Sequence, residues 1–233
     1  MDAPFFFIDA VLEEGAVITP PEDTARHMVQ VLRMREGELL IITNGKGRSA
    51  QCKILSVSKK SCTISVGQVT ITPVRKRKVT IAISLLKNAN RFEWFLEKAA
   101  ELGVDRVVPL QCARTEKQHF RKDRAKTILV SALQQSQQVW LTEITDPTPI
   151  DTFLQEPLSG PGFIAHCEPS EKQELSGKRL ELATILIGPE GDFTPSEIDA
   201  AISKGFIPVS LGDTRLRTET AGVVAGVKLL LEY

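Results

Sequence analysis

The first 72 residues combine short apolar segments with closely spaced turn signals, a pattern typical of a small β-domain. Strands are expected over 38–43, 49–55 and 62–66. The first two are joined by the hairpin signal Asn44-Gly45-Lys46-Gly47, and Ser58-Lys59-Lys60 forms the next turn. One short helix is expected over 22–32, and the hairpin spacing of the strands predicts a small β-barrel.

Further along the chain, apolar runs alternate with segments of helical spacing. Residues 79–86 are nearly all apolar, as expected of a parallel strand covered on both faces. A helix is expected over 91–102, with Gly103 as its stop, and 104–110 is the next strand, which completes a βαβ unit. A long helix is expected over 123–138. These elements predict an α/β fold with a parallel sheet.

The C-terminal part repeats one unit, a strand, a glycine-containing loop and a helix. The strands are expected over 182–187 and 207–211, and the loops over 188–193 and 212–217. The first helix begins at the capping box Thr194-Pro195-Ser196-Glu197 and runs to Gly205. Thr218 is expected to cap the second helix, which continues to the C-terminus.

Ligands of open parallel sheets bind outside the carboxyl ends of the strands, so Gly188 and Gly212 mark the expected place of a small cofactor. On spacing alone, a tight turn built on Gly188 and Gly191 explains the first loop as well. Common nucleotide and hydrolase motifs are absent: the chain has no GxxxxGK[ST], no GxGxxG after a strand and no GxSxG.

Arg215-Leu216-Arg217-Thr218-Glu219 places two guanidinium groups and a carboxylate at a helix N-terminus. This arrangement suits a site that stabilises a developing anion. In the simpler interpretation, Glu219 neutralises the helix dipole and Arg217 pairs with it. Small residues follow at Ala221, Gly222, Ala225 and Gly226. They favour close approach of another element, either in a dimer interface or within the same chain.

Composition excludes several classes of protein. With 42% hydrophobic and 25% charged residues, the 233-residue chain is an ordinary globular sequence. It has no apolar run of about 18 residues and no signal peptide, so a cytoplasmic location without membrane spans is expected. Its four cysteines are far apart and are expected to be reduced and buried. With three dispersed histidines, no metal site is expected.

The net charge of zero conceals a segregation. Residues 26–78 contain twelve bases and only two acids, a formal charge of +10. Such a segment is typical of a surface that binds a polyanion such as RNA, and a solvated face with a charged linker at 75–78 explains it equally well. The composition changes at Pro73, so we expect two domains, 1–72 and 73–233.

Several motifs together resemble the ribosomal RNA small-subunit methyltransferase E family of the SPOUT class. They are Val31-Leu32-Arg33-Met34, 98–104, Ile187-Gly188-Pro189-Glu190-Gly191, Ser210-Leu211-Gly212 and Leu216-Arg217-Thr218-Glu219-Thr220-Ala221. They span nearly the whole chain in the family's order. Two departures stand out: Asp192 replaces a common second glycine, and Gln134–Gln138 lack the usual Glu-Gln pair with a following Arg.

The resemblance implies a PUA-like β-barrel for RNA binding and a SPOUT-type α/β domain with a trefoil knot. The implied activity is methylation of N3 of a uridine in 16S ribosomal RNA of the small subunit by S-adenosylmethionine, without a metal, in a homodimer. Implied cofactor-binding residues are Ile187, Gly188, Gly191, Leu211, Gly212, Leu216 and Arg217. An RNA-binding role of the β-barrel domain would explain the basic segment, and the RNA contacts expected from it are Arg26, Arg33, Arg35, Lys46, Arg48, Lys59 and Lys60.

Removal of the uridine N3 proton leaves negative charge on the base. We expect Arg217 to stabilise this charge, and Glu219 to orient Arg217 or to accept the proton. Two alternatives remain: a non-catalytic RNA-binding or ribosome-assembly protein, and the same chemistry on another RNA such as transfer RNA.

Overall fold

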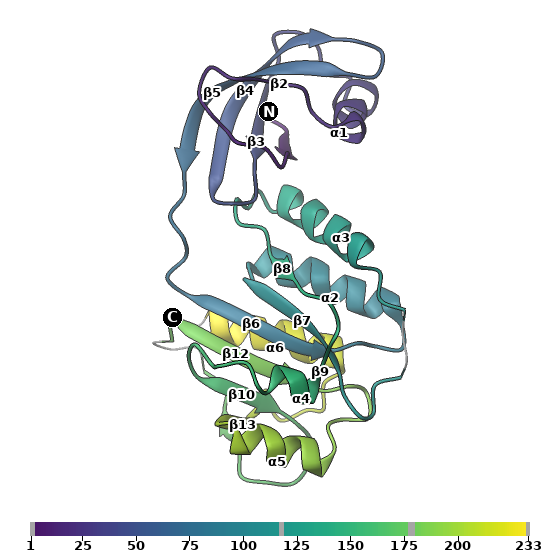
Figure 1. Ribbon diagram of the computed structural model, residues 1–233, viewed down its shortest axis with the longest axis vertical. Helices are drawn as coiled ribbons and strands as arrows, with labels where there is room; N and C mark the ends of the chain where they lie inside the picture. The colour runs from purple at the N-terminus through teal and green to yellow at the C-terminus, as the bar shows by residue number, and fades with distance from the viewer. Residues whose placement is uncertain (1–2, 117–118, 177–179, 232–233) are drawn as a thin grey trace. The chain divides into compact units, whose positions relative to one another are not determined.

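The computed structural model describes residues 3–116, 119–176 and 180–231. The chain divides into two units (Figure 1). The first contains the chain up to Val74 together with Leu133–Leu141, and the second contains Arg75–Ala132 and the chain from Thr142 on.

The first unit is built on a five-stranded sheet. Its elements are β1 (Phe5–Phe7), β2 (Val17–Ile18), α1 (Glu22–Arg26), the π-helix η1 (His27–Val31), β3 (Leu39–Thr43), β4 (Arg48–Val57) and β5 (Cys62–Ile71). The strand order is β1-β3-β4-β5-β2, with β1 parallel to β3 and the other pairs antiparallel. Both predicted hairpins and the helical segment over 22–32 are confirmed. In the described part of the chain, the edge strands β1 and β2 are not paired with each other.

Residues 133–141, which the sequence analysis placed in the second domain, complete the first unit. The Gly47 N–H donates to the Val139 carbonyl at 2.8 Å, and a β-bridge joins Lys46 to Trp140. Gly47 has a φ of +81°, and a Cβ there would collide with the indole of Trp140. Glycine at this turn is therefore required both by the backbone and by the ring packed on it.

A parallel sheet organises the second unit. Its elements are β6 (Lys78–Ser84), α2 (Ala89–Leu102), β7 (Arg106–Gln111), α3 (Lys122–Gln135, whose last residues belong to the first unit), β8 (Glu143–Ile144), β9 (Thr148–Pro149), α4 (Ile150–Phe153), β10 (Gly162–Ala165), β11 (Gln173–Glu174), β12 (Leu182–Ile187), α5 (Pro195–Ser203), β13 (Phe206–Ser210) and α6 (Thr218–Leu230). The strand order is β11-β13-β10-β12-β6-β7-β8, and β9 also pairs with β7. Helices α2 and α6 cover one face, and α4 and α5 pack on the other (Figure 1).

Most predicted elements of this unit are confirmed, because their signals are local. Gly103 ends α2 in the left-handed conformation with a φ of +82°, and the Thr194–Glu197 capping box forms with both of its hydrogen bonds. The predicted cap of α6 is wrong by one residue: Arg217 is the N-cap, and Thr218 is the first helical residue. The last two positions of the predicted helix lie outside the described residues. The trefoil knot stays a prediction.

The small residues of α6 pack within the chain. A Cβ at Gly222 would lie 2.6 Å from the ring of Phe95, and one at Gly226 would lie 3.2 Å from Leu102, both on α2. Of the two interpretations of this stripe, the structure supports close packing of α6 on α2.

The thiols differ in exposure. Cys52, Cys62 and Cys112 are buried, as predicted, and burial raises the pKa of Cys52 to about 11 and that of Cys112 to about 12. The prediction is wrong for Cys167, which is exposed. Within the described ranges, no helix has the length and apolar character needed to cross a membrane.

Candidate functional site

A cavity of about 920 Å³ opens at the carboxyl ends of β10, β12 and β13, three adjacent strands of the second unit. Most of its lining comes from three segments at the ends of these strands and directly after them: 165–167, 187–190 and 209–218. Of the predicted cofactor-binding residues, Ile187, Gly188, Leu211, Gly212, Leu216 and Arg217 line the cavity. Gly191 is not among its lining residues. The sheet thus brings both predicted loops to one site, where parallel sheets bind ligands.

The first loop, residues 188–193, is held by hydrogen bonds along its length. Arg114 donates from Nη1 to the carbonyls of Gly191 at 2.7 Å and Phe193 at 3.3 Å. Gly191 therefore takes part in the hydrogen bonds that hold this loop. Asp192 has a φ of +64°, and its carboxylate accepts hydrogen bonds from the N–H groups of Cys167 at 2.7 Å and Phe193 at 2.8 Å. The aspartate that departs from the family pattern therefore adopts the left-handed turn and also bonds the end of β10 to the loop.

The second loop, residues 211–217, is held by few contacts. Ser210 Oγ donates to the Gly212 carbonyl at 3.0 Å and accepts from the Gly212 N–H at 3.2 Å. Gly212 has a φ of +145°, and nothing lies within 4 Å of a Cβ built on it. Residues 212–215 are exposed, and no hydrogen bond involves the side chains at 213–217 within the described part of the chain.

Arg91, the third residue of α2, joins the two loop-and-helix units and was not predicted from the sequence. Its Nε donates to Glu219 Oε1 at 2.8 Å, its Nη2 donates to Glu219 Oε2, and its Nη1 lies 3.3 Å from Glu190 Oε1. The Arg91 guanidinium therefore forms a bidentate hydrogen bond with Glu219 at the start of α6 and also contacts Glu190 in the first loop. Arg91 and Glu219 are 128 positions apart, and no local pattern around Arg91 signals this contact.

The expected pairing of Arg217 with Glu219 is wrong, because both oxygens of the Glu219 carboxylate bond to Arg91. Burial raises the pKa of Glu219, but hydrogen bonds from Arg91 and the backbone, with the charges of Arg91 and Arg217, hold it below its usual value. Glu219 is thus an anchored carboxylate. Arg217 is exposed at the cavity wall, and its side chain makes no hydrogen bond or ion pair with another described residue.

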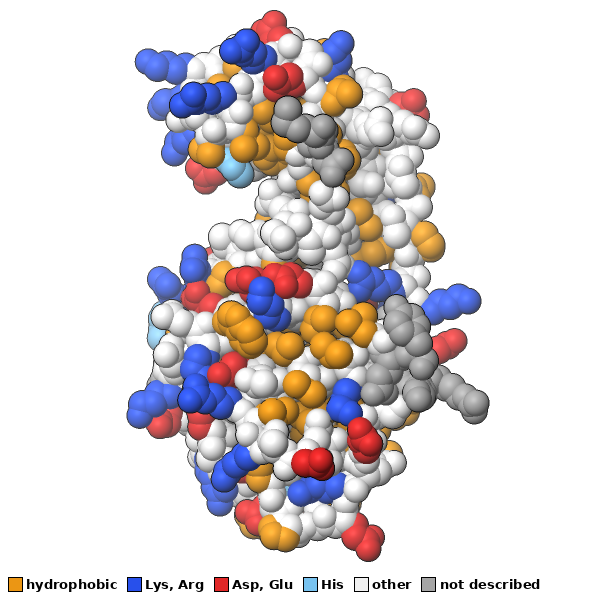
Figure 2. Space-filling view, turned by 180° about the vertical axis from the view of Figure 1, so that it is seen from behind, with side chains coloured by type: hydrophobic (Ala, Val, Ile, Leu, Met, Phe, Trp, Pro, Cys, Tyr) orange, Lys and Arg blue, Asp and Glu red, His pale blue; other side chains and the backbone are white. Residues whose placement is uncertain are grey.

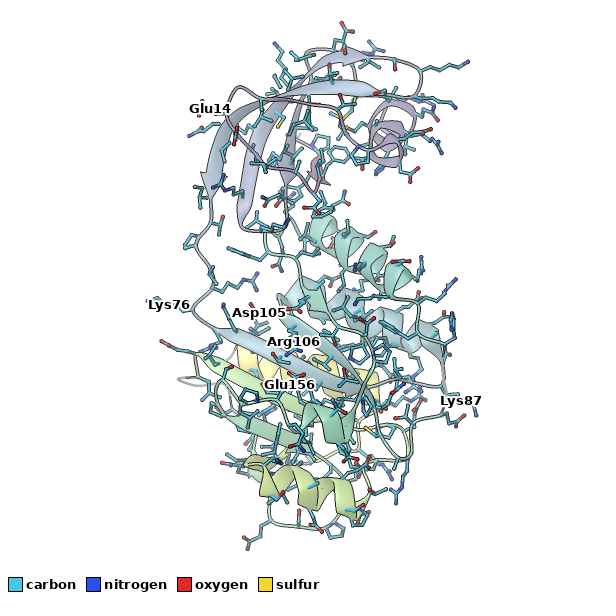
Figure 3. The ribbon with its side chains drawn as sticks, viewed as in Figure 1. Glu14, Lys76, Lys87, Asp105, Arg106 and Glu156 are labelled. Carbon is cyan, nitrogen blue, oxygen red and sulfur yellow. The ribbon has the colours of Figure 1, made fainter. Side chains whose placement is uncertain are left out.

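A second cavity, of about 340 Å³, lies at the opposite end of the sheet, around the first residues of β6, β7 and β12. Three of its charged groups have partners: Arg106 pairs with Glu156 at 3.0 Å, and Asp105 accepts the Val79 N–H at 2.9 Å (Figure 3). It lacks the glycine-containing loops of the larger cavity, which is therefore the better candidate site. Among the described residues, no group of three or more His, Cys, Asp or Glu side chains is placed to hold a metal ion.

The seven predicted RNA contacts are all exposed on the first unit, but they fall into separate groups. Four form what we call the basic rim: Arg33, Arg35, Lys59 and Lys60. Gln30 donates from Nε2 to the Lys59 carbonyl at 3.0 Å, and Glu36 accepts the Val57 N–H at 3.3 Å. These bonds hold the chain after η1 against the β4–β5 turn, so the four bases lie at one end of the sheet. Figure 2 shows several basic side chains gathered on one side of this unit.

The other three predicted contacts lie elsewhere or are paired. Lys46 and Arg48 are at the far end of the ten-residue strand β4, about 30 Å from the basic rim by strand geometry. Lys46 pairs with Asp9 at 2.8 Å, and Arg48 donates to the Leu12 carbonyl at 3.4 Å. Arg26 pairs with Glu22 at 2.9 Å. A continuous patch of all seven is thus not formed.

Comparisons with known proteins agree with this architecture. Residues 73–229 match a family model described as an RNA methyltransferase domain, and residues 20–67 match an RNA methyltransferase PUA domain. The chain is 30% identical to the ribosomal RNA small subunit methyltransferase E of Synechocystis sp., over 90% of this chain and 71% of that protein.

Several solved structures resemble this chain over nearly its whole length. A probable rRNA-methyltransferase from Porphyromonas gingivalis is 34% identical, with a TM-score of 0.88 and 98% of each chain covered. The ribosomal RNA small subunit methyltransferase E from Neisseria gonorrhoeae, bound to S-adenosyl methionine, is 25% identical, with a TM-score of 0.88 over 97% of this chain and 96% of that one.

Proposed function

The chain belongs to the ribosomal RNA small subunit methyltransferase E family, and from this premise we propose that it methylates N3 of a uridine in 16S ribosomal RNA, with S-adenosylmethionine as methyl donor. The observation that carries the proposal is the 920 Å³ cavity, which both family loops line at the carboxyl ends of three parallel strands. Because ribosomes are made in the cytoplasm, a cytoplasmic location follows from this substrate.

The cavity fits S-adenosylmethionine in size and in chemistry. Its volume lies within the range of small-molecule sites. The walls expose backbone at Gly188 and Gly212, apolar surface at Ile187 and Leu211, and one buried imidazole without a partner, that of His166. When bound, S-adenosylmethionine supplies an electrophilic methyl group with a built-in leaving group. We propose that Ile187, Gly188, Leu211, Gly212, Leu216 and Arg217 hold it, while Gly191 acts through its bond to Arg114.

Arg217 is the residue that we propose to be catalytic. Loss of the uridine N3 proton leaves a negative charge on the ring carbonyls, and an unpaired guanidinium at the cavity wall is suited to stabilise it. Glu219 takes a positioning role in this proposal, because its lowered pKa makes it a weak proton acceptor and both oxygens hold Arg91. The base must leave its stack to be reached, which favours a uridine in an unpaired or distorted segment.

We propose that residues 1–72 bind RNA and that residues 73–233 bind the cofactor and catalyse. The basic rim supplies unpaired positive charge for the phosphate backbone. Replacing Lys59 and Lys60 by Glu should weaken RNA binding and lower its salt dependence. The matched control Lys46→Glu should have a smaller effect, because Lys46 is already paired with Asp9.

We also propose a homodimer that uses the outer face of α2 and α6. Trp94 and Val227 on this face are 43% and 39% exposed. Figure 2 shows hydrophobic side chains gathered on the second unit when it is viewed from the side of these helices. Large exposed apolar patches commonly mark protein interfaces. Light scattering should give the mass of a dimer for the natural chain and a smaller mass for Trp94→Glu combined with Val227→Glu.

The direct test is a methyl-transfer assay with labelled S-adenosylmethionine and small ribosomal subunits from a strain that lacks this protein. Parallel reactions contain naked 16S RNA and bulk transfer RNA, and the products are hydrolysed to nucleosides. We expect N3-methyluridine from ribosomal material. Label found only in transfer RNA would overturn the substrate, and absence of both label and cofactor binding would favour a non-catalytic RNA-binding protein.

A further inference from the structure

His166 directly follows β10 and lines the candidate cofactor cavity. His166 is only 8% exposed, and both ring nitrogens, Nδ1 and Nε2, are buried without a hydrogen-bond partner among the described residues. Buried polar atoms in proteins almost always have partners, and an unpaired one costs about 1–3 kcal/mol. An imidazole with two such atoms beside an open cavity therefore indicates a ligand that supplies the missing partner.

The polar groups around His166 are engaged elsewhere. The Asp192 carboxylate accepts the N–H groups of Cys167 and Phe193, and Lys172 donates from Nζ to the Glu168 carbonyl at 2.6 Å. The charges that face the ring are those of Lys172, Asp192 and Glu168. Among the described residues, the neighbouring groups thus supply no hydrogen-bond partner to either ring nitrogen.

The surroundings of the ring favour its neutral form. Burial lowers the pKa of His166, and the charge of Lys172 lowers it further, against smaller opposing effects of Asp192 and Glu168. A neutral imidazole offers one N–H donor and one acceptor nitrogen. It also adds no positive charge to a cavity that, by the proposed function, accepts a sulfonium cation.

We propose that His166 binds S-adenosylmethionine through a hydrogen bond between its imidazole ring and a polar group of the cofactor, and so positions the cofactor in the cavity. This inference rests on the proposed function, because it takes S-adenosylmethionine as the occupant. It adds to the two loops a third contact, from the end of β10, the strand between β12 and β13.

The test is calorimetric binding of S-adenosylmethionine and S-adenosylhomocysteine to the natural chain and to His166→Phe, which keeps a ring and removes both nitrogens. We expect the dissociation constants of both ligands to rise at least about tenfold, equivalent to about 1.4 kcal/mol. The melting temperature of the ligand-free variant should not fall, because the lost nitrogens had no partner to lose. His166→Gln, which keeps a polar end, should bind more tightly than His166→Phe.

His119→Phe is the matched control. His119 is exposed and lies outside the lining of the cavity, so the same substitution there should leave both dissociation constants unchanged. A second readout uses ¹⁵N spectra of the three histidines, in which saturation with S-adenosylmethionine should shift a ring nitrogen of His166 and not those of His27 or His119.

The outcomes separate the inference from the function on which it rests. If the natural chain binds S-adenosylmethionine and His166→Phe binds it within twofold of that affinity, the role of His166 is refuted and the proposed function stands. If the natural chain binds neither ligand, the proposed function fails, and this inference fails with it.

Discussion

The two loops of the cavity each connect a parallel strand to a helix, yet they are held in different ways. Residues 188–193 are bonded to Arg114, to Arg91 and to the end of β10, and Phe193 is fully buried. Residues 211–217 are exposed over most of their length and bonded chiefly through Ser210. One wall of the site is thus fixed before any ligand arrives, and the other is free to adjust.

This difference gives the two loops different roles in ligand binding. A fixed wall lowers the conformational entropy lost when a ligand binds. A loosely held loop closes on its ligand and excludes water when it does so. The proposed catalytic group, Arg217, ends the loosely held loop and stands next to Glu219, which Arg91 anchors. The proposed catalytic side chain is therefore attached to an anchored helix end, while no other described side chain bonds to it.

The largest expected effect is on catalysis through the second loop. Arg217→Ala should lower the methyl-transfer rate about 100-fold or more at saturating substrates. The free energy of unfolding should change by less than about 0.5 kcal/mol, because the side chain is exposed and unpaired. Single-turnover kinetics and urea unfolding measure the two quantities. Arg215→Ala, in the same loop, is the control and should keep most of the rate; a full rate in Arg217→Ala would contradict the assigned role.

The next largest effect is expected on stability, from breaking the ion pair between Arg91 and Glu219. Arg91→Met leaves the Glu219 carboxylate, whose side chain is 9% exposed, without its partner, and should lower the free energy of unfolding by about 2–3 kcal/mol. Adding Glu219→Gln should recover part of this loss. Additive single and double mutants in urea unfolding would show that the pair is not coupled.

The same pair predicts a dependence on pH. The pKa of Glu219 is lower in the folded protein than in the unfolded chain, so its stabilisation is complete above the unfolded pKa. It is lost as the pH falls through the lower, folded pKa. The stability difference between the natural chain and the double mutant should therefore shrink between pH 7 and about pH 3.

A smaller effect on the free energy of unfolding is expected from substitutions of the aspartates in the two loops, and it should differ between them. Asp192→Ala removes the acceptor of two backbone N–H groups and should cost about 1–2 kcal/mol of stability. Asp192→Gly loses the same bonds but relieves the positive φ, so it should cost less. Asp213→Ala, in the exposed loop, should change stability by less than about 0.5 kcal/mol. Equal costs at positions 192 and 213 would contradict the contrast between the loops.

The smallest expected effect is on the local opening of the two loops, measured as amide hydrogen exchange. Saturation with S-adenosylmethionine should slow amide hydrogen exchange in residues 211–217 on the order of tenfold, and should change residues 188–193 less, because these are already bonded. Mass spectrometry of peptic fragments measures both segments in one experiment. Equal protection of the two loops would show that the ligand orders both.

The loops were predictable because their signals are local. Glycine at 188 and 212, the capping box at 194–197 and the apolar strands before them can be interpreted from short windows of sequence. The cap of α6 was misplaced by one residue because Thr218 is a common capping residue, whereas the backbone bends at Arg217. Strand β10 was missed because it has four residues within a segment rich in Pro and Gly.

Contacts that depend on the fold escaped prediction. Nothing near Arg91 shows that its partner lies 128 positions away. His166 follows the missed strand, so its place in the cavity could not be inferred before that strand was known. The seven basic residues were grouped by their nearness in sequence, while the ten-residue strand β4 carries two of them to the far end of its sheet. Charge composition identifies an RNA-binding segment more readily than the surface that it forms.

The position of Trp140 in the chain determines when the first unit can be completed during translation. The indole and its neighbours at 133–141 complete the first unit beneath Gly47, although β6, α2, β7 and most of α3 precede them in the chain. A nascent polypeptide that has emerged from the ribosome only as far as residue 74 therefore holds every strand of its first sheet and still lacks a piece of that unit. Completion of the N-terminal unit therefore requires more than half of the chain to be translated, up to residue 141.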